Sequence, residues 1–245
     1  SNTYKAGRHF LSVPGPTNIP DRVLQAMAFP AMDHRGPDFQ NLSNSILKKI
    51  KLIFKSEDPV VIFPSAGTGA MEASLANTLS EGDKILMFET GHFATEWCQA
   101  ALRYKLNVDF VPGDWRTGAD PKIVEKKLRE DKNHEIKAVL VTHNETSTGI
   151  KSQIEEVRKA IDSTNHPALF MVDTISSLGS YNYEHQKWKV DVTVGGSQKG
   201  LMSPPGLSFN AISSKALEAY KKSNLTKSYF DWGQMLENTK PAIGH

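Results

Sequence analysis

The chain has 245 residues, of which 39% are hydrophobic and 23% are charged, and its formal net charge is +2. This composition is typical of a globular protein with one sizeable core, and it excludes disordered and fibrous classes. Because no long block of one charge sign stands out, the sequence predicts neither nucleic acid nor a membrane as a partner. The single cysteine cannot form an internal disulfide, and no secretory signal or membrane-spanning run is visible. We therefore expect a cytoplasmic protein.

Apolar runs typical of buried strands alternate with segments whose apolar residues have helical spacing. The strand-like runs cover residues 60–64, 84–89, 107–112, 137–143, 168–173, 190–196 and 207–213. The helix-like segments cover residues 38–55, 68–79, 93–105, 120–130, 151–163 and 214–222. This alternation predicts the α/β class with a mostly parallel sheet, whose ligands bind beyond the carboxyl ends of the strands.

The first strand-like run leads into "SAGTGAMEA", a glycine-rich turn before a helix. Gly67 and Gly69 let the backbone bend closely, and the helix that follows points unpaired N–H groups at whatever binds there. The turn lacks the Walker spacing, so it favours a single phosphate group, with the Thr68 hydroxyl as a further donor. The plainer alternative is a tight turn without a ligand.

Two further strands end in groups that can carry charge. Asp173 closes the run 168–173, where a desolvated carboxylate needs a cation or several donors; the alternative is a carboxylate that caps its own turn. Lys199 follows the run 190–196 in "GGSQKGLMSPPG", although a surface lysine is the ordinary interpretation. A phosphate site, a carboxylate and an amine on one face match the needs of pyridoxal 5'-phosphate.

The segments "PGPTNIP", "SAGTGAMEA", "THNETSTG", "VDTISSLG" and "GGSQKGLMSPPG" resemble the class V aminotransferases of fold type I, and most of all the serine and alanine glyoxylate aminotransferases. The resemblance implies an N-terminal arm over residues 1–30 and a pyridoxal-phosphate-binding large domain with a seven-stranded sheet over residues 31–245. It also implies a small C-terminal domain that holds the arginine for the substrate carboxylate. That domain is absent from this sequence.

The resemblance also assigns roles to individual residues. Lys199 forms the Schiff base with the cofactor and moves the substrate proton, while Asp173 pairs with the pyridine nitrogen. Phe93 stacks on the pyridine ring and Ile175 presses its other face. Without the resemblance Phe93 is a core residue at a helix start, and Trp97, one turn further on, is a less favoured stacking residue.

The remaining cofactor contacts follow in the same way. Ala66, Gly67 and Thr68 correspond to the phosphate loop, Gln198 is a further phosphate ligand, and Thr146 lies near the ring hydroxyl. We expect no metal, because His34, His92 and His143 lack paired ligand spacing and are interpreted as structural. Arg35 is also interpreted as structural.

The implied function is transfer of an amino group from a small amino acid, with serine favoured, to glyoxylate, in a homodimer with shared sites. Alanine-, aspartate- or 2-aminoethylphosphonate aminotransferase activity is the nearest alternative. A lyase or desulfurase of the same fold would need a reactive cysteine, and Cys98 falls within a helix where we expect it to be inert. A truncated, non-catalytic binding protein is the remaining alternative.

Overall fold

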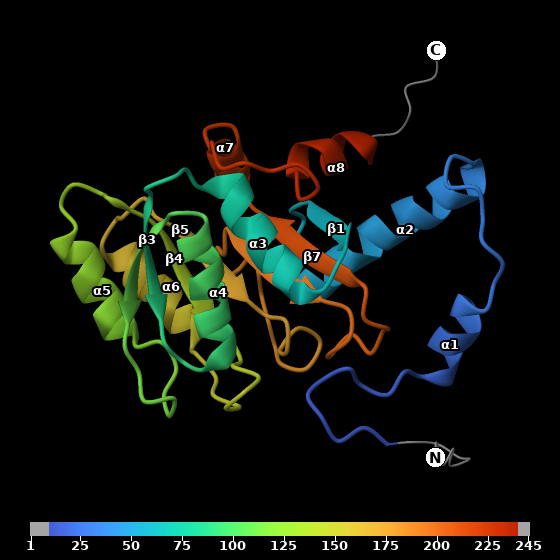
Figure 1. Ribbon diagram of the computed structural model, residues 1–245, viewed down its shortest axis with the longest axis horizontal. Helices are drawn as coiled ribbons and strands as arrows, with labels where there is room; N and C mark the ends of the chain where they lie inside the picture. The colour runs from blue at the N-terminus through green and yellow to red at the C-terminus, as the bar shows by residue number, and fades with distance from the viewer. Residues whose placement is uncertain (1–9, 240–245) are drawn as a thin grey trace.

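The computed structural model describes residues 10–239, which form a central sheet with helices on both faces (Figure 1). Within that range no helix combines the length and the apolar character needed to cross a membrane. The strands are β1 (Val60–Pro64), β2 (Lys84–Phe88), β3 (Asn107–Val111), β4 (Ile136–Thr142), β5 (Leu169–Asp173), β6 (Val192–Gly196) and β7 (Leu207–Ile212). The helices are α1 (Asp21–Met27), α2 (Pro37–Phe54), α3 (Gly67–Thr78), α4 (His92–Arg103), α5 (Pro121–Glu130), α6 (Ile154–Ser163), α7 (Ser214–Tyr220) and α8 (Trp232–Asn238).

The strands form one seven-stranded sheet in the order β1-β7-β6-β5-β4-β2-β3. Neighbouring strands from β3 to β6 are parallel, whereas β7 is antiparallel to both β1 and β6. The predicted mostly parallel α/β sheet is therefore confirmed, with every expected strand in place.

Three helical features differ from the sequence prediction. α6 begins at Ile154 instead of residue 151, because Lys151 pairs with Asn144 in an isolated bridge and stays extended. The sequence prediction also missed α1 and α8. α1 has no buried residue, so its sequence has no apolar stripe that faces a core. α8 begins after Asp231, whose side chain accepts N–H bonds from the first turn of the helix.

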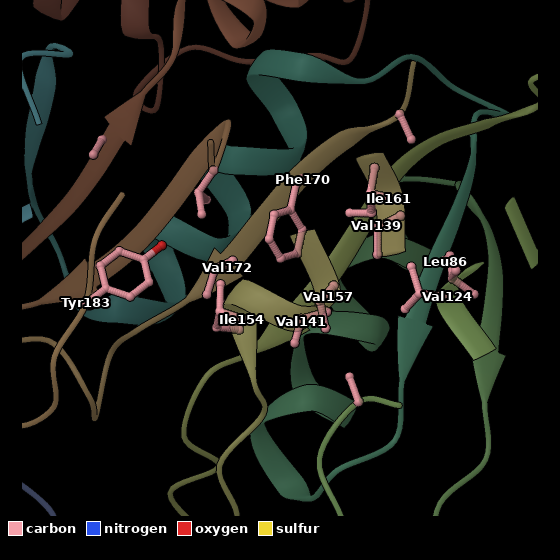
Figure 2. Close-up of a cluster of buried hydrophobic side chains, with 14 of the residues drawn as sticks. Leu86, Val124, Val139, Val141, Ile154, Val157, Ile161, Phe170, Val172 and Tyr183 are labelled. Carbon is pink, nitrogen blue, oxygen red and sulfur yellow. The ribbon is translucent and has the colours of Figure 1, made fainter. Parts of the chain in front are cut away.

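Alternating side chains of the sheet feed two separate cores. Figure 2 shows Phe170 and Val172 of β5 on the same side as Ile154 and Val157 of α6. Met171, between the two β5 residues, belongs to the opposite core with α3 and α4. Because β5 is buried on both faces, its carboxyl end carries a polar residue into a desolvated place.

Candidate active site

Asp173 ends β5 and retains 3% of its surface exposure. Its Oδ1 accepts the N–H of Ile175 at 2.8 Å, and the described part of the chain supplies no second hydrogen bond to this carboxylate. Burial raises the pKa of Asp173 to about 7; the Ile175 hydrogen bond and the Lys199 charge oppose this rise, and Glu145 adds to it. The site therefore holds a carboxylate that a cationic partner would stabilise in its ionised form.

Lys199 lies in the turn after β6, which we call the lysine turn (residues 197–202). Its carbonyl oxygen accepts the N–H of Met202 at 2.9 Å. The Nζ atom lies 5.9 Å from the centre of the Phe93 ring. Burial lowers the pKa of Lys199 and the nearby Asp173 charge opposes that change, so the amine is easier to deprotonate than an exposed lysine. The two residues predicted to converge are within electrostatic reach of one another.

The phosphate loop (residues 66–68) opens α3, and the structure gives this helix start no side-chain cap. Gly67 is so close to Ile175 that a Cβ on Gly67 would stand 2.5 Å from Ile175 Cδ1. Gly196 faces the same place, since its Cβ position would be 3.7 Å from the Gly67 nitrogen and 3.2 Å from Gln198 Oε1. Glycine at both positions leaves the N–H groups of the loop open to a ligand.

Gln198 carries a buried amide oxygen, Oε1, that has no hydrogen-bond partner among the described residues. A buried amide group without a partner costs free energy unless a ligand or water satisfies it. The amide also carries two N–H donors, which suit an anion. Gln198 therefore has an acceptor oxygen that still lacks a donor, and its N–H groups are the part of the amide that suits an anion beside the phosphate loop.

Glu145 is a buried residue of the site for which the sequence suggested no role. Its Oε2 accepts the N–H of Ala94 at 3.0 Å, and its Oε1 accepts the N–H of Phe93 at 3.1 Å and the hydroxyl of Ser147 at 2.8 Å. These bonds tie the loop after β4, which also carries the half-buried Thr146, to the start of α4. The sequence shows Glu145 as an acidic residue in "NETSTG", but it does not show that the start of α4 is its hydrogen-bond partner.

Several other candidates lie outside the site. Trp97 is buried in the core and donates its Nε1–H to the Met71 carbonyl, so it is not available for stacking on a ligand. Cys98 is buried, and burial raises the pKa of its thiol, as expected for an inert cysteine. His143 is buried against Ser177, and burial, with a smaller effect of the Lys151 charge, lowers the pKa of its ring to about 4.

The remaining polar candidates lie on the surface. His34, Arg35 and His92 are exposed, and the Arg35 N–H donates to Asp33 Oδ1 at 3.0 Å. Over residues 10–239, no group of three His, Cys, Asp or Glu residues could hold a metal ion.

Three observations test the fit of pyridoxal 5'-phosphate to these residues. The uncapped start of α3 suits the phosphate, and the Gln198 amide, whose N–H groups are donors, lies beside it. Asp173 is a buried carboxylate with one hydrogen bond, which suits a pyridinium nitrogen. Lys199 offers a partly desolvated amine on the same edge of the sheet. The residues present fit the cofactor.

Fold and site together define an α/β domain that gathers an anion site, a carboxylate and an amine at one edge of its sheet. The model of the family "Aminotransferase class-V" matches residues 9–240. The chain belongs to this family, and its sheet and flanking helices are those of the fold type I aminotransferases.

Three similar proteins illustrate the match. The serine–glyoxylate aminotransferase of Methylorubrum extorquens is 48% identical over 236 residues, which cover 94% of this chain and 59% of that protein. The enzyme of the same name from Arabidopsis thaliana is 44% identical, covering 96% of this chain and 59% of its own length. The crystal structure of an alanine–glyoxylate aminotransferase from Nostoc sp. superposes with a TM-score of 0.89 at 28% identity, covering 100% of this chain and 64% of the other. The chain thus spans about three fifths of the curated relatives.

Proposed function

We propose that this chain is the cofactor-binding part of an aminotransferase that uses pyridoxal 5'-phosphate to move an amino group from a small amino acid to glyoxylate. The observation that carries the proposal is the convergence of the buried Asp173 carboxylate and the Lys199 amine at one edge of the sheet. Serine is the favoured donor, since relatives at 44–48% identity are serine–glyoxylate aminotransferases. An L-aspartate–glyoxylate relative at 44% identity keeps aspartate as the alternative donor.

When bound, pyridoxal 5'-phosphate supplies an electron sink for the negative charge that develops at the substrate carbon. Asp173 holds the ring nitrogen in its protonated form, because two opposite charges in a desolvated place stabilise one another. Lys199 would attach the cofactor and, once released by the substrate, would carry the proton from the substrate α carbon to the cofactor carbon, which requires a partly neutral amine. The lowered pKa of Lys199 serves this step.

The other residues orient the cofactor. Ala66, Gly67 and Thr68 would bind the phosphate through the start of α3, which has no side-chain cap, and the N–H groups of the Gln198 amide would donate to it. Phe93 and Ile175 are half-buried at the same edge as Lys199 and would pack on the two faces of the ring. Thr146 would donate to the ring hydroxyl.

The substrates proposed for the whole protein are small amino acids and keto acids, bound in a cytoplasmic homodimer whose two sites are shared between subunits. This part of the proposal comes from the family resemblance, in which a small C-terminal domain provides the arginine for the substrate carboxylate. An arginine suits that role because it binds a carboxylate through two parallel hydrogen bonds.

The test is a visible absorbance spectrum of the full-length protein with pyridoxal phosphate, recorded after adding serine and then glyoxylate. The proposal predicts a band that serine bleaches and glyoxylate restores. Lys199→Ala should abolish the cycle, whereas Lys122→Ala, at an exposed position of α5, should leave it intact. A band bleached by aspartate and unaffected by serine would change the donor. A protein that stays colourless would overturn the proposed function.

A further inference from the structure

Residues 15–17, far from Lys199 in sequence, contact the lysine turn directly. The N–H of Thr17 donates to the Gln198 carbonyl oxygen at 3.0 Å. The Thr17 hydroxyl lies 3.4 Å from the same oxygen and 3.3 Å from the carbonyl oxygen of Lys199. One residue of the N-terminal segment therefore contacts the backbone carbonyl oxygens on both sides of the Lys199 Cα.

Gly15 contacts the side chain of the same lysine. A Cβ on Gly15 would overlap Lys199 Cδ and would stand 2.8 Å from Cε and 3.2 Å from the Gln198 carbonyl oxygen. The methylene stem of Lys199 therefore lies against the bare backbone of Gly15. Any side chain at position 15 would displace the stem, which is flexible enough to move without unfolding the protein.

The surroundings argue that this contact is local and not part of a core. Phe10 and Val13 are 85% and 52% exposed, and α1, which follows, has no buried residue. Figure 1 shows α1 on the outside of the molecule, away from the sheet. Substitutions at positions 15 and 17 should therefore act on Lys199 more than on the stability of the domain.

The lysine turn already has a support on its other side. Met202 donates to the Lys199 carbonyl, and Gly200 lies so close to Ser180 that a Cβ at position 200 would be 3.0 Å from the Ser180 nitrogen. These contacts hold the backbone of the turn and involve no atom of the Lys199 side chain. Gly15, by contrast, contacts the stem itself at Cδ and Cε.

We propose that Gly15 and Thr17 form a positioning strap that sets the direction of the Lys199 side chain, with Thr17 holding the backbone and Gly15 bearing on the methylene stem. The use of this positioning rests on the proposed aminotransferase function. In that enzyme, the strap would return the Lys199 amine to one place after each turnover. By covering the stem, the strap also contributes to the desolvation that lowers the pKa of Lys199. Neither residue touches the reacting atoms.

The experiment measures Lys199 itself and needs neither cofactor nor activity. The full-length, cofactor-free protein is treated with acetic anhydride at a series of pH values, and peptide mass spectrometry gives the acetylation of Lys199 relative to the exposed Lys122. The strap predicts that Gly15→Ala and Thr17→Val raise the pH midpoint of Lys199 labelling, because the stem is less covered. At a pH below the midpoint, a rise of half a pKa unit lowers the neutral fraction of the Lys199 amine about threefold.

Two variants separate positioning from a general tether. Thr17→Ser keeps the hydroxyl, so its Lys199 should be labelled as in wild type. Val13→Ala, at an exposed position of the same segment, should also leave Lys199 labelling unchanged. If Gly15→Ala and Thr17→Val label Lys199 like Val13→Ala, the strap is wrong, whatever their melting temperatures. Labelling is independent of cofactor binding, so a protein that fails to bind pyridoxal phosphate would overturn the proposed function and still test the strap.

Discussion

The Oε1 atom of Glu145 accepts the backbone N–H of Phe93 at 3.1 Å, although the two residues lie 52 positions apart. The bond links the loop after β4 to the first turn of α4 and so fixes the residue whose ring faces the Lys199 amine. A carboxylate at a helix start also meets the positive end of the helix dipole.

Glu145→Ala should lower the free energy of unfolding by about 2–4 kcal/mol, because it leaves buried N–H groups without acceptors. Glu145→Gln should cost less, since its amide oxygen can replace Oε1, although its NH2 group then faces the Ala94 N–H. Urea unfolding measures both changes. Glu96→Gln, on the exposed face of the same helix, is the control, and an equal loss for Glu96→Gln and Glu145→Ala would contradict the role of Glu145.

Asp173 predicts a pH dependence of stability in the cofactor-free protein. Burial raises its pKa from 3.8 to about 7, so the folded state binds more protons than the unfolded state between these values. Stability should therefore fall as the pH rises from about 4 to about 7. Asp173→Asn cannot titrate and should lose this fall, which urea unfolding across the pH range detects. Parallel pH profiles for wild type and variant would show that Asp173 is not the titrating group.

Gly67 and Ile175 should be energetically coupled. Gly67→Ala places a methyl group 2.5 Å from Ile175 Cδ1, and such overpacking lowers the free energy of unfolding by about 1–3 kcal/mol. Alanine also has a better helix propensity than glycine, which offsets up to about 1 kcal/mol of this loss. Ile175→Ala removes the clashing atoms, so Gly67→Ala should be harmless in that background. A double-mutant cycle should give a coupling of about 1 kcal/mol or more, and additive free energies would refute the contact.

Gln198→Ala should leave stability within about 1 kcal/mol of wild type, because the amide oxygen it removes has no partner among the described residues. The same change should weaken binding of inorganic phosphate about tenfold, which is about 1.4 kcal/mol. Phosphate titrations that follow the unfolding midpoint measure this affinity, with Gln40→Ala on the surface of α2 as the control. Unchanged phosphate binding in Gln198→Ala would remove Gln198 from the anion site.

Much of the fold was predictable, because the strands are apolar runs. Turn residues and segments with helically spaced apolar residues separate these runs. β5 and β6 are both buried throughout. In β5 the sequence shows this as an apolar stretch that runs unbroken up to Asp173. The position of Asp173 and Lys199 at one edge followed from reading the end of each strand. α1 could not be predicted in this way, because it buries nothing.

The supporting contacts of the site were beyond the sequence. Thr17 and Lys199 are 182 positions apart, and no local pattern pairs the Pro-Gly-Pro segment before Thr17 with one particular turn. Glu145 is similar, since an acidic residue in a polar loop is ordinarily solvated and its burial depends on the approach of α4. The assigned roles of Phe93, Thr146 and Ile175 remain predictions.

The proposed function depends on Lys199 being the amine that holds pyridoxal 5'-phosphate. The most direct test is borohydride reduction of the full-length protein after incubation with the cofactor, followed by peptide mapping with mass spectrometry. If Lys199 holds the cofactor, the reduced adduct is found on the peptide that contains Lys199, and none is found at that position in Lys199→Ala. An adduct spread over exposed lysines such as Lys122, with Lys199 unmodified, would contradict it.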